Sequence, residues 1–176
     1  MGASDWSYTV PHSYDIAGAL EQLRAEIYER GEYYKQEPDP ALRMNEDEFK
    51  STLDLDNDPD GIQEFLLEEW RKAKNRPVPV DADTLIAAQP DSGTHSIIDI
   101  YEGLSETPEL FTASPLTAEQ LLDYFRTDLP TTPQVLMWMS TFDISSIRSR
   151  WEAAYLVSYS PAGLPEQIHF KGYSGD

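Results

Sequence analysis

Hydrophobic residues recur with helical spacing near the start of the chain. Within residues 13–31 the apolar positions lie four, three and four residues apart, on one face of a helix: Ile16, Leu20, Leu23 and Ile27. Ser13 or Asp15 can cap the first turn, and Gly31 stands where a helix commonly ends. The pattern therefore predicts a helix between these two signals.

Similar patterns predict further helices. Residues 45–53 and 62–73 have helical periodicity, and the second segment carries a broad apolar stripe: Ile62, Phe65, Leu66, Leu67 and Trp70. A short helix capped by Asp81 or Asp83 is expected to run to about Ala88. Residues 117–120 match a capping box, and Thr132 followed by proline starts another helix.

Runs of β-branched and aromatic residues predict the strands. Residues 6–10 form an opening strand that Pro11 closes, while 153–159 and 167–173 form a hairpin with a longer loop. Residues 93–100 pass from a glycine turn into an apolar, β-branched run, which we interpret as a central strand. About four mainly antiparallel strands packed with about five helices indicate an α+β fold.

The length and composition fit one globular domain. The chain has 176 residues, of which 40% are hydrophobic, and this is enough for a core. We expect a single domain over residues 1–176, with residues 32–79 as a candidate acidic helical insertion. There are no cysteines, the longest apolar runs have five residues, and no secretory signal is visible. These features predict a cytoplasmic protein that does not cross a membrane.

The charge of the chain limits the classes of molecule that it is expected to bind. The formal net charge is −19, and residues 81–128 hold ten carboxylates against one basic residue, Arg126. Such a field repels nucleic-acid phosphates and anionic lipid, and it favours cations or a basic protein partner. The alternative is that the negative charge only keeps the protein soluble, or adapts it to a cytoplasm with a high salt concentration. The oligomeric state stays open.

His95 and Asp99 are the candidate catalytic residues. They are the titratable pair inside the apolar run of residues 93–100. In a strand both side chains face the same way but lie roughly 13 Å apart, so they cannot hydrogen-bond each other. A dyad would need a partner from another element, such as Glu102, Glu166 or His169. The alternative is structural, with His95 fixing a loop and Asp99 paired with an arginine such as Arg148.

The other two histidines give weaker signals. His169 alternates with Ile168 and Phe170, so we place it on the opposite, solvated face of its strand. His12 follows Pro11 at a turn and is expected to cap a helix or lie exposed. No histidine pair has metal-ligand spacing, so no transition-metal site is indicated.

One acidic loop resembles a calcium-binding loop. Asp56, Asp58 and Asp60 occupy positions 1, 3 and 5 of an EF-hand pattern, with Gly61 at position 6. The bidentate glutamate of position 12 is missing, since Leu67 stands there, so calcium would bind weakly. The alternative is a solvated loop between two helices. No other cofactor is expected.

Three segments carry a resemblance to known proteins. The opening residues 6–11, the segment 93–100 and the end 170–176 together resemble a set of small bacterial proteins without an assigned activity. That set combines a W-S-x-x-V-P start, a G-T-H-S-I-[IL]-D-I segment and an F-x-G-Y-S-x-D end. The resemblance implies a bacterial, cytoplasmic protein and supplies no catalytic residues. We also expect the three segments to meet in one sheet.

Two classes of function are compatible with these features of the sequence. The first is a non-enzymatic interaction module, immunity- or antitoxin-like, that binds a basic partner; it is favoured because no GxSxG, GxGxxG or P-loop motif occurs. The second is a small hydrolase-like or metal-assisted enzyme that uses His95 and Asp99. Weak calcium binding at residues 56–61 is a further alternative.

Overall fold

The computed structural model describes residues 4–37, 39–89 and 93–175. The chain divides into two compact units, one of Met1–Tyr34 with Val80–Asp176 and one of Lys35–Pro79. We call them the sheet unit and the helical unit. The helical unit falls within the segment 32–79 that the sequence marks as a candidate insertion.

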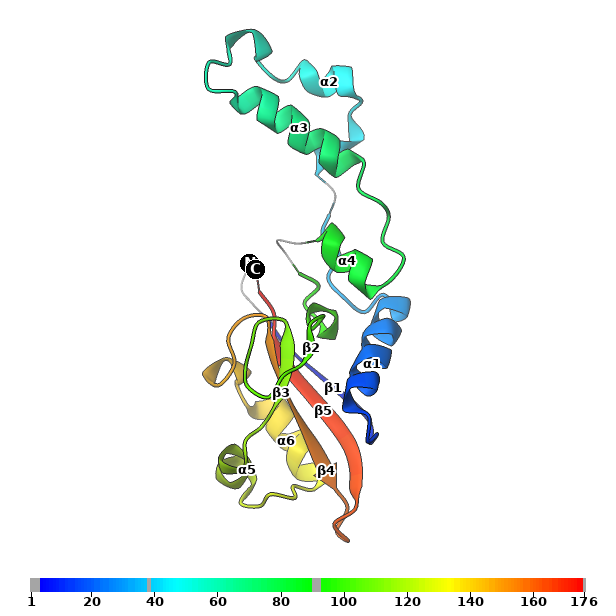
Figure 1. Ribbon diagram of the computed structural model, residues 1–176, viewed down its shortest axis with the longest axis vertical. Coiled ribbons are helices and arrows are strands. Elements are labelled where there is room, and N and C mark those ends of the chain that lie inside the picture. Colours follow the sequence, from blue (N-terminus) through cyan, green and yellow to red (C-terminus); the bar gives the residue numbers. More distant parts are fainter. Residues whose placement is uncertain (1–3, 38, 90–92, 176) are drawn as a thin grey trace. The chain divides into compact units, whose positions relative to one another are not determined.

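A five-stranded mixed sheet forms the centre of the sheet unit, with the strand order β1-β5-β4-β3-β2 (Figure 1). The two antiparallel pairs involve the long strands β1 (Asp5–Pro11), β4 (Glu152–Tyr159) and β5 (Pro165–Tyr173). The short strands β3 (Thr112–Pro115) and β2 (Gly103–Leu104) extend the sheet in parallel beyond β4. β1 therefore lies at one edge of the sheet and β2 at the other.

Helices cover both faces of this sheet. Helix α1 (Ile16–Arg30) lies on one face, together with α4 (Ala82–Ala88) and the 3-10 turn η3 (Ile97–Asp99). Helices α5 (Ala118–Phe125) and α6 (Thr132–Thr141) lie on the other face with the 3-10 turn η4 (Ile144–Ser146), as Figure 1 shows. The fold is thus a three-layer arrangement of helix, sheet and helix.

The alternation of side chains along β5 divides the interior into two cores. Ile168 and Phe170 point toward α1 and are fully buried in the first core. His169 and Lys171 point the other way, toward α6, and are buried as well. Because both faces of β5 are covered, this strand has no solvated side in its second half.

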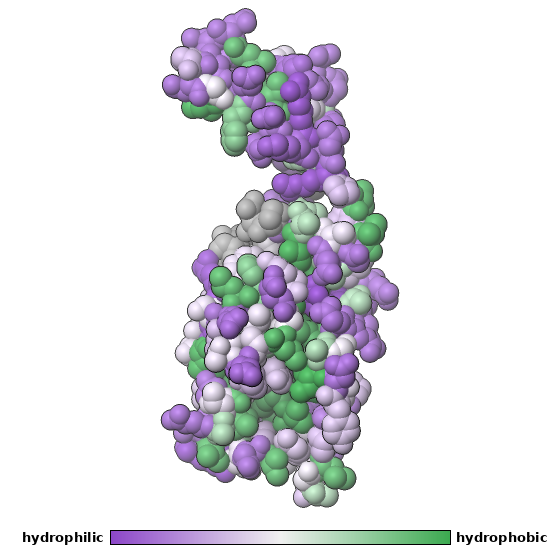
Figure 2. Space-filling view, in the orientation of Figure 1, coloured by the Kyte–Doolittle hydropathy of each residue, from purple (hydrophilic) through white to green (hydrophobic). Residues whose placement is uncertain are grey.

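The helical unit consists of short elements around one aromatic pair. It contains the 3-10 turns η1 (Pro40–Arg43) and η2 (Leu55–Asn57) and the helices α2 (Glu46–Lys50) and α3 (Ile62–Lys74). Phe49 stacks on Trp70 at 4.9 Å between ring centroids, and the indole N–H of Trp70 donates to the carbonyl of Ala41. In the view of Figure 2 the surface of this unit is mainly hydrophilic.

The predicted α+β class is confirmed, with differences in detail. The described chain has six α-helices and five strands rather than about five and four, and two of the four strand pairings are parallel. Strands β2 and β3 were not predicted, because two and four residues are too short to show alternation. The caps of α1 at Asp15 and Gly31 lie where the sequence placed them.

The apolar stripe predicted for residues 62–73 is buried only in part. Leu67 and Trp70 are buried, whereas Ile62, Phe65 and Leu66 are exposed. A unit of this size has too few elements to cover every apolar position of its longest helix.

Candidate functional site

The predicted central strand at residues 93–100 is wrong. The segment forms a turn and the 3-10 turn η3, with His95 in the left-handed region at φ 53°. Its apolar residues are nevertheless buried, because Ile97, Ile98 and Ile100 all belong to the core beneath α1. The β-branched run therefore reflects burial rather than an extended backbone.

Asp99 holds this turn together from the inside. Its Oδ1 accepts hydrogen bonds from the backbone N–H and the hydroxyl of Thr94, at 2.7 and 2.8 Å. Its Oδ2 accepts from the hydroxyl of Ser174 at 3.2 Å, which connects the turn to the residue after β5. The side chain is only 1% exposed, and burial raises its pKa. Asp99 is a structural bridge between two distant segments.

His95 is the only residue of segment 93–100 that is not buried. Its Nδ1 lies 3.1 Å from the hydroxyl of Ser4, and its ring lies against Tyr34 at 4.9 Å between centroids. Neither contact supplies a carboxylate that would orient the ring as a general base. His95 and Asp99 are thus held by separate hydrogen-bond partners, His95 by Ser4 and Asp99 by Thr94 and Ser174.

The partners suggested by the sequence for this pair lie elsewhere. Arg148 does not face Asp99; its guanidinium donates to backbone carbonyls, including those of Ala153 and Ser114. Glu166 accepts a hydrogen bond from the hydroxyl of Thr132. Within the described residues, the side chain that reaches Asp99 from outside its own turn is Ser174.

The expected solvated position of His169 is wrong. The residue is fully buried, with Nδ1 2.9 Å from the hydroxyl of Thr9 and Nε2 2.9 Å from the hydroxyl of Ser158. Burial lowers its pKa to about 4, so the ring is neutral at physiological pH. Alternation along β5 alone would leave one of its faces to solvent, but α6 covers that face.

The calcium-like loop does not gather its carboxylates. The Oδ2 of Asp58 accepts the backbone N–H of Glu64 at 2.9 Å and so stabilises the start of α3. Over the described residues there is no group of three or more His, Cys, Asp or Glu side chains arranged to hold a metal ion. Asp56, in η2, and Asp60, in the turn before α3, are both exposed.

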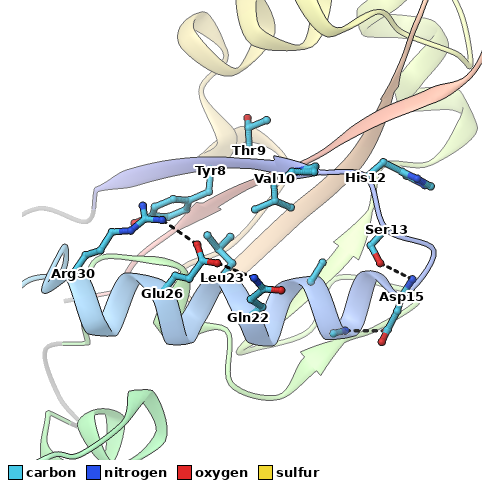
Figure 3. A pocket seen from close by; sticks show the side chains of 13 residues that line it. Tyr8, Thr9, Val10, His12, Ser13, Asp15, Gln22, Leu23, Glu26 and Arg30 are labelled. Atoms are coloured by element: carbon cyan, nitrogen blue, oxygen red, sulfur yellow. Dashed lines mark hydrogen bonds and ion pairs between the residues drawn. The ribbon is translucent and has the colours of Figure 1, made fainter.

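A groove lies between β1 and α1 on the sheet unit. Its volume is about 710 Å³, and residues from the second half of β1 face residues along α1 across it (Figure 3). Val10 and Leu23 point toward each other from the two walls, whereas Thr9 points to the opposite face of the sheet. The helix residues Gly18 and Ala19 line the groove here, and their small size leaves space between α1 and β1.

The groove has a mixed but mainly acidic rim. Glu26 accepts hydrogen bonds from Gln22 and Arg30, both at 2.9 Å, and Asp15 caps the first turn of α1 by accepting from Gly18. Arg30 is also within 3.8 Å of Glu32. Two features of the sequence could have indicated this groove: the alternation in β1, and the small residues Gly18 and Ala19 inside α1.

The cations of the sheet unit are largely withdrawn from its surface. This unit contains twenty Asp and Glu residues against six Lys and Arg. Three of the six cations are buried: Arg24, Arg148 and Lys171. Arg24 pairs with Glu21 and Asp83, and Lys171 donates to Asp5 and to the carbonyl of Met139. Exposed carboxylates therefore outnumber exposed cations on this unit.

Comparison of the chain with protein-family models, curated proteins and solved structures gives no match. Among the described residues, no helix has both the length and the apolar character needed to span a bilayer.

Proposed function

We propose that this chain is a non-enzymatic, acidic interaction module that binds a basic protein partner, in the manner of immunity and antitoxin proteins. The observation that carries the proposal is the burial of three of the six cations of the sheet unit. Of these six cations, Arg30, Arg126 and Arg150 are exposed, against a large excess of carboxylates on the same unit. Such a surface attracts a basic partner over a distance and speeds its association.

The buried polar groups also support the proposal, because they argue against an enzymatic role. Asp99, a candidate catalytic residue, and His169, a candidate partner for it, are each enclosed and hydrogen-bonded to hydroxyl groups. A general base must reach the proton that it removes, directly or through one water. These two groups have the geometry of internal supports, which suits a binding scaffold.

Affinity capture followed by reconstitution tests the proposal. The full-length chain is immobilised and exposed to host-cell lysate at low salt, beside an unrelated acidic protein of the same net charge. The captured protein is then purified, and its dissociation constant is measured by calorimetry at several salt concentrations. We expect a basic protein that binds with defined stoichiometry and weakens as salt rises. Capture of the same proteins by both baits would contradict the proposal.

A pair of charge variants locates the effect. Glu102, Glu106 and Glu109 are exposed and form no ion pair among the described residues, so their change to glutamine removes three charges from the sheet unit. The matched control removes three charges from the helical unit at Asp60, Glu64 and Glu68. We expect the first variant to slow association with the reconstituted partner severalfold more than the second does.

A further inference from the structure

Strand β1 has an unpaired outer edge. It pairs with β5 on one side, and over the described residues no strand lies on its other side. Unpaired edges normally attract further strands, and proteins protect them with prolines and charges. Here Asp5 and Pro11 stand at the two ends of β1, while the stretch between them has no such protection.

The register shows which backbone groups face outward. The N–H of His12 donates to Glu166 and the carbonyl of Ser4 accepts from Ser174, so even-numbered residues of this strand bond toward β5. In an antiparallel ladder the alternate residues point the other way. The N–H groups of Asp5, Ser7 and Thr9 and the carbonyls of the same residues therefore face the free edge.

The groove beside this edge has room for one more strand. It runs along the α1 side of β1, has a volume of about 710 Å³ and is floored by Val10 and Leu23 (Figure 3), with Ala19 also in its lining. An added strand would lie about 4.8 Å from β1, with every second side chain directed at this apolar floor. The walls thus offer main-chain hydrogen bonds on one side and an apolar contact on the other.

Charge distinguishes the two kinds of strand that could pair with this edge, one from a second copy of the chain and one from a different protein. A second copy of the chain would bring together two molecules that each carry a net charge of −19, which opposes association. The one cation that lines the groove, Arg30, is already engaged by Glu26 and Glu32. The complementary occupant is an extended segment of a basic protein.

We propose that the groove between β1 and α1 binds an extended segment with alternating apolar and basic residues, which adds to the sheet as a strand beside β1. This inference rests on the proposed function and names the part of the partner that is recognised. Backbone bonds to Ser7 and Thr9 provide affinity, and apolar side chains over Val10 and Leu23 provide register.

A defined peptide tests this inference with the full-length protein. The probe is an acetylated, amidated seven-residue peptide of alternating valine and lysine, and the control replaces every lysine with glutamate. The readouts are the dissociation constant and the change in amide NMR signals and hydrogen exchange. We expect the lysine peptide to bind, the glutamate peptide not to bind, and the amides of Ser7 and Thr9 to become protected.

Two pairs of variants distinguish strand addition from general attraction. Ser7→Pro removes an outward N–H at an edge position that tolerates proline, while Ser7→Ala keeps it. We expect the first to weaken binding about tenfold and the second to leave it unchanged, in line with the loss of one ladder bond and steric hindrance. Gln22→Trp, which fills the groove, should also abolish binding, whereas Ala25→Trp on the exposed side of α1 should not.

The outcomes separate this inference from the proposed function. Peptide binding with signal changes away from β1 and α1, or equal affinity of Ser7→Pro and Ser7→Ala, overturns the groove but leaves a basic partner possible elsewhere. No binding of the lysine peptide also overturns it. Protection of Ser7 and Thr9 in a concentration-dependent dimer without peptide shows that a second copy covers the edge, which overturns it too. Only the capture experiment decides the proposed function.

Discussion

Two buried titratable side chains connect the stability of the sheet unit to pH in opposite directions. His169 is a base whose pKa is lowered by burial, and Asp99 is an acid whose pKa is raised by burial. In both cases the enclosed side chain favours its neutral form. The two effects can be separated because a single substitution removes each one.

His169 should make the protein less stable in acid. The unfolded chain takes up a proton near pH 6.5, but the folded chain keeps the ring neutral until a pKa of about 4. Stability is therefore complete above pH 6.5 and falls by about 3 kcal/mol as the pH decreases to 4. Urea unfolding of the protein and of His169→Gln across this range measures the difference. A difference between the two that does not change with pH would show that the ring is not enclosed in solution.

Asp99 should act in the opposite sense. Because its folded pKa lies above the ordinary value, the folded state binds the proton more readily than the unfolded state. The protein should thus gain stability relative to Asp99→Asn as the pH falls toward about 4. Asp99→Ala removes the acceptor of Thr94 and Ser174, so we expect a loss of about 3 kcal/mol at neutral pH. If the protein instead lost stability relative to Asp99→Asn in acid, the ionised carboxylate would be the favoured form.

At the scale of elements, a close approach between β1 and β5 explains why position 172 is a glycine. Trp6 and Gly172 are cross-strand partners, and a Cβ at position 172 would overlap the indole ring. Gly172→Ala should therefore cost about 1–3 kcal/mol in unfolding free energy. The same change in a Trp6→Leu background should cost much less, because the smaller side chain leaves space. Equal costs in the two backgrounds, measured by urea unfolding, would rule out this overlap as the reason for glycine.

The elements that the sequence predicts well are those with local signals. Helix α1 has its own periodicity, its cap at Asp15 and its stop at Gly31, and these need no distant residue. The conformation of segment 93–100 is not determined by local signals alone. Its conformation depends on Asp99 bonding both to Thr94 and to Ser174, seventy-five residues away, so the pattern revealed burial but not backbone shape.

The candidate site shows the same limit. His95 and Asp99 stand close in sequence, but tertiary partners decide which of them is enclosed and which reaches the surface. The burial of His169 depends on α6, which covers the face that alternation alone would leave to solvent. The groove depends on which strand lies at the sheet edge, and strand order cannot be read from alternation.

At the scale of the whole molecule, the hydrophobic cores and the excess of negative charge are concentrated in one of the two units. The sheet unit holds both hydrophobic cores and most of the charge excess, whereas the helical unit contributes twelve carboxylates and seven cations around a small aromatic centre. Among the residues of Lys35–Pro79 that the structure describes, none belongs to either core of the sheet unit. The stability of the sheet unit and its proposed binding groove should thus be properties of that unit alone.

Replacement of residues 35–79 by a flexible glycine–serine linker tests this independence. Because both cores remain complete, we expect the shortened protein to unfold cooperatively, with a midpoint within a few degrees of the full chain. The length of the new linker should have little effect on the unfolding midpoint, since the entropy of closing a loop depends only weakly on its length. Circular dichroism and thermal unfolding measure the fold, and amide spectra of β1 and α1 serve as the control for an unchanged groove. A shortened chain that fails to fold would show that the helical unit stabilises the sheet unit by contacts beyond the two cores.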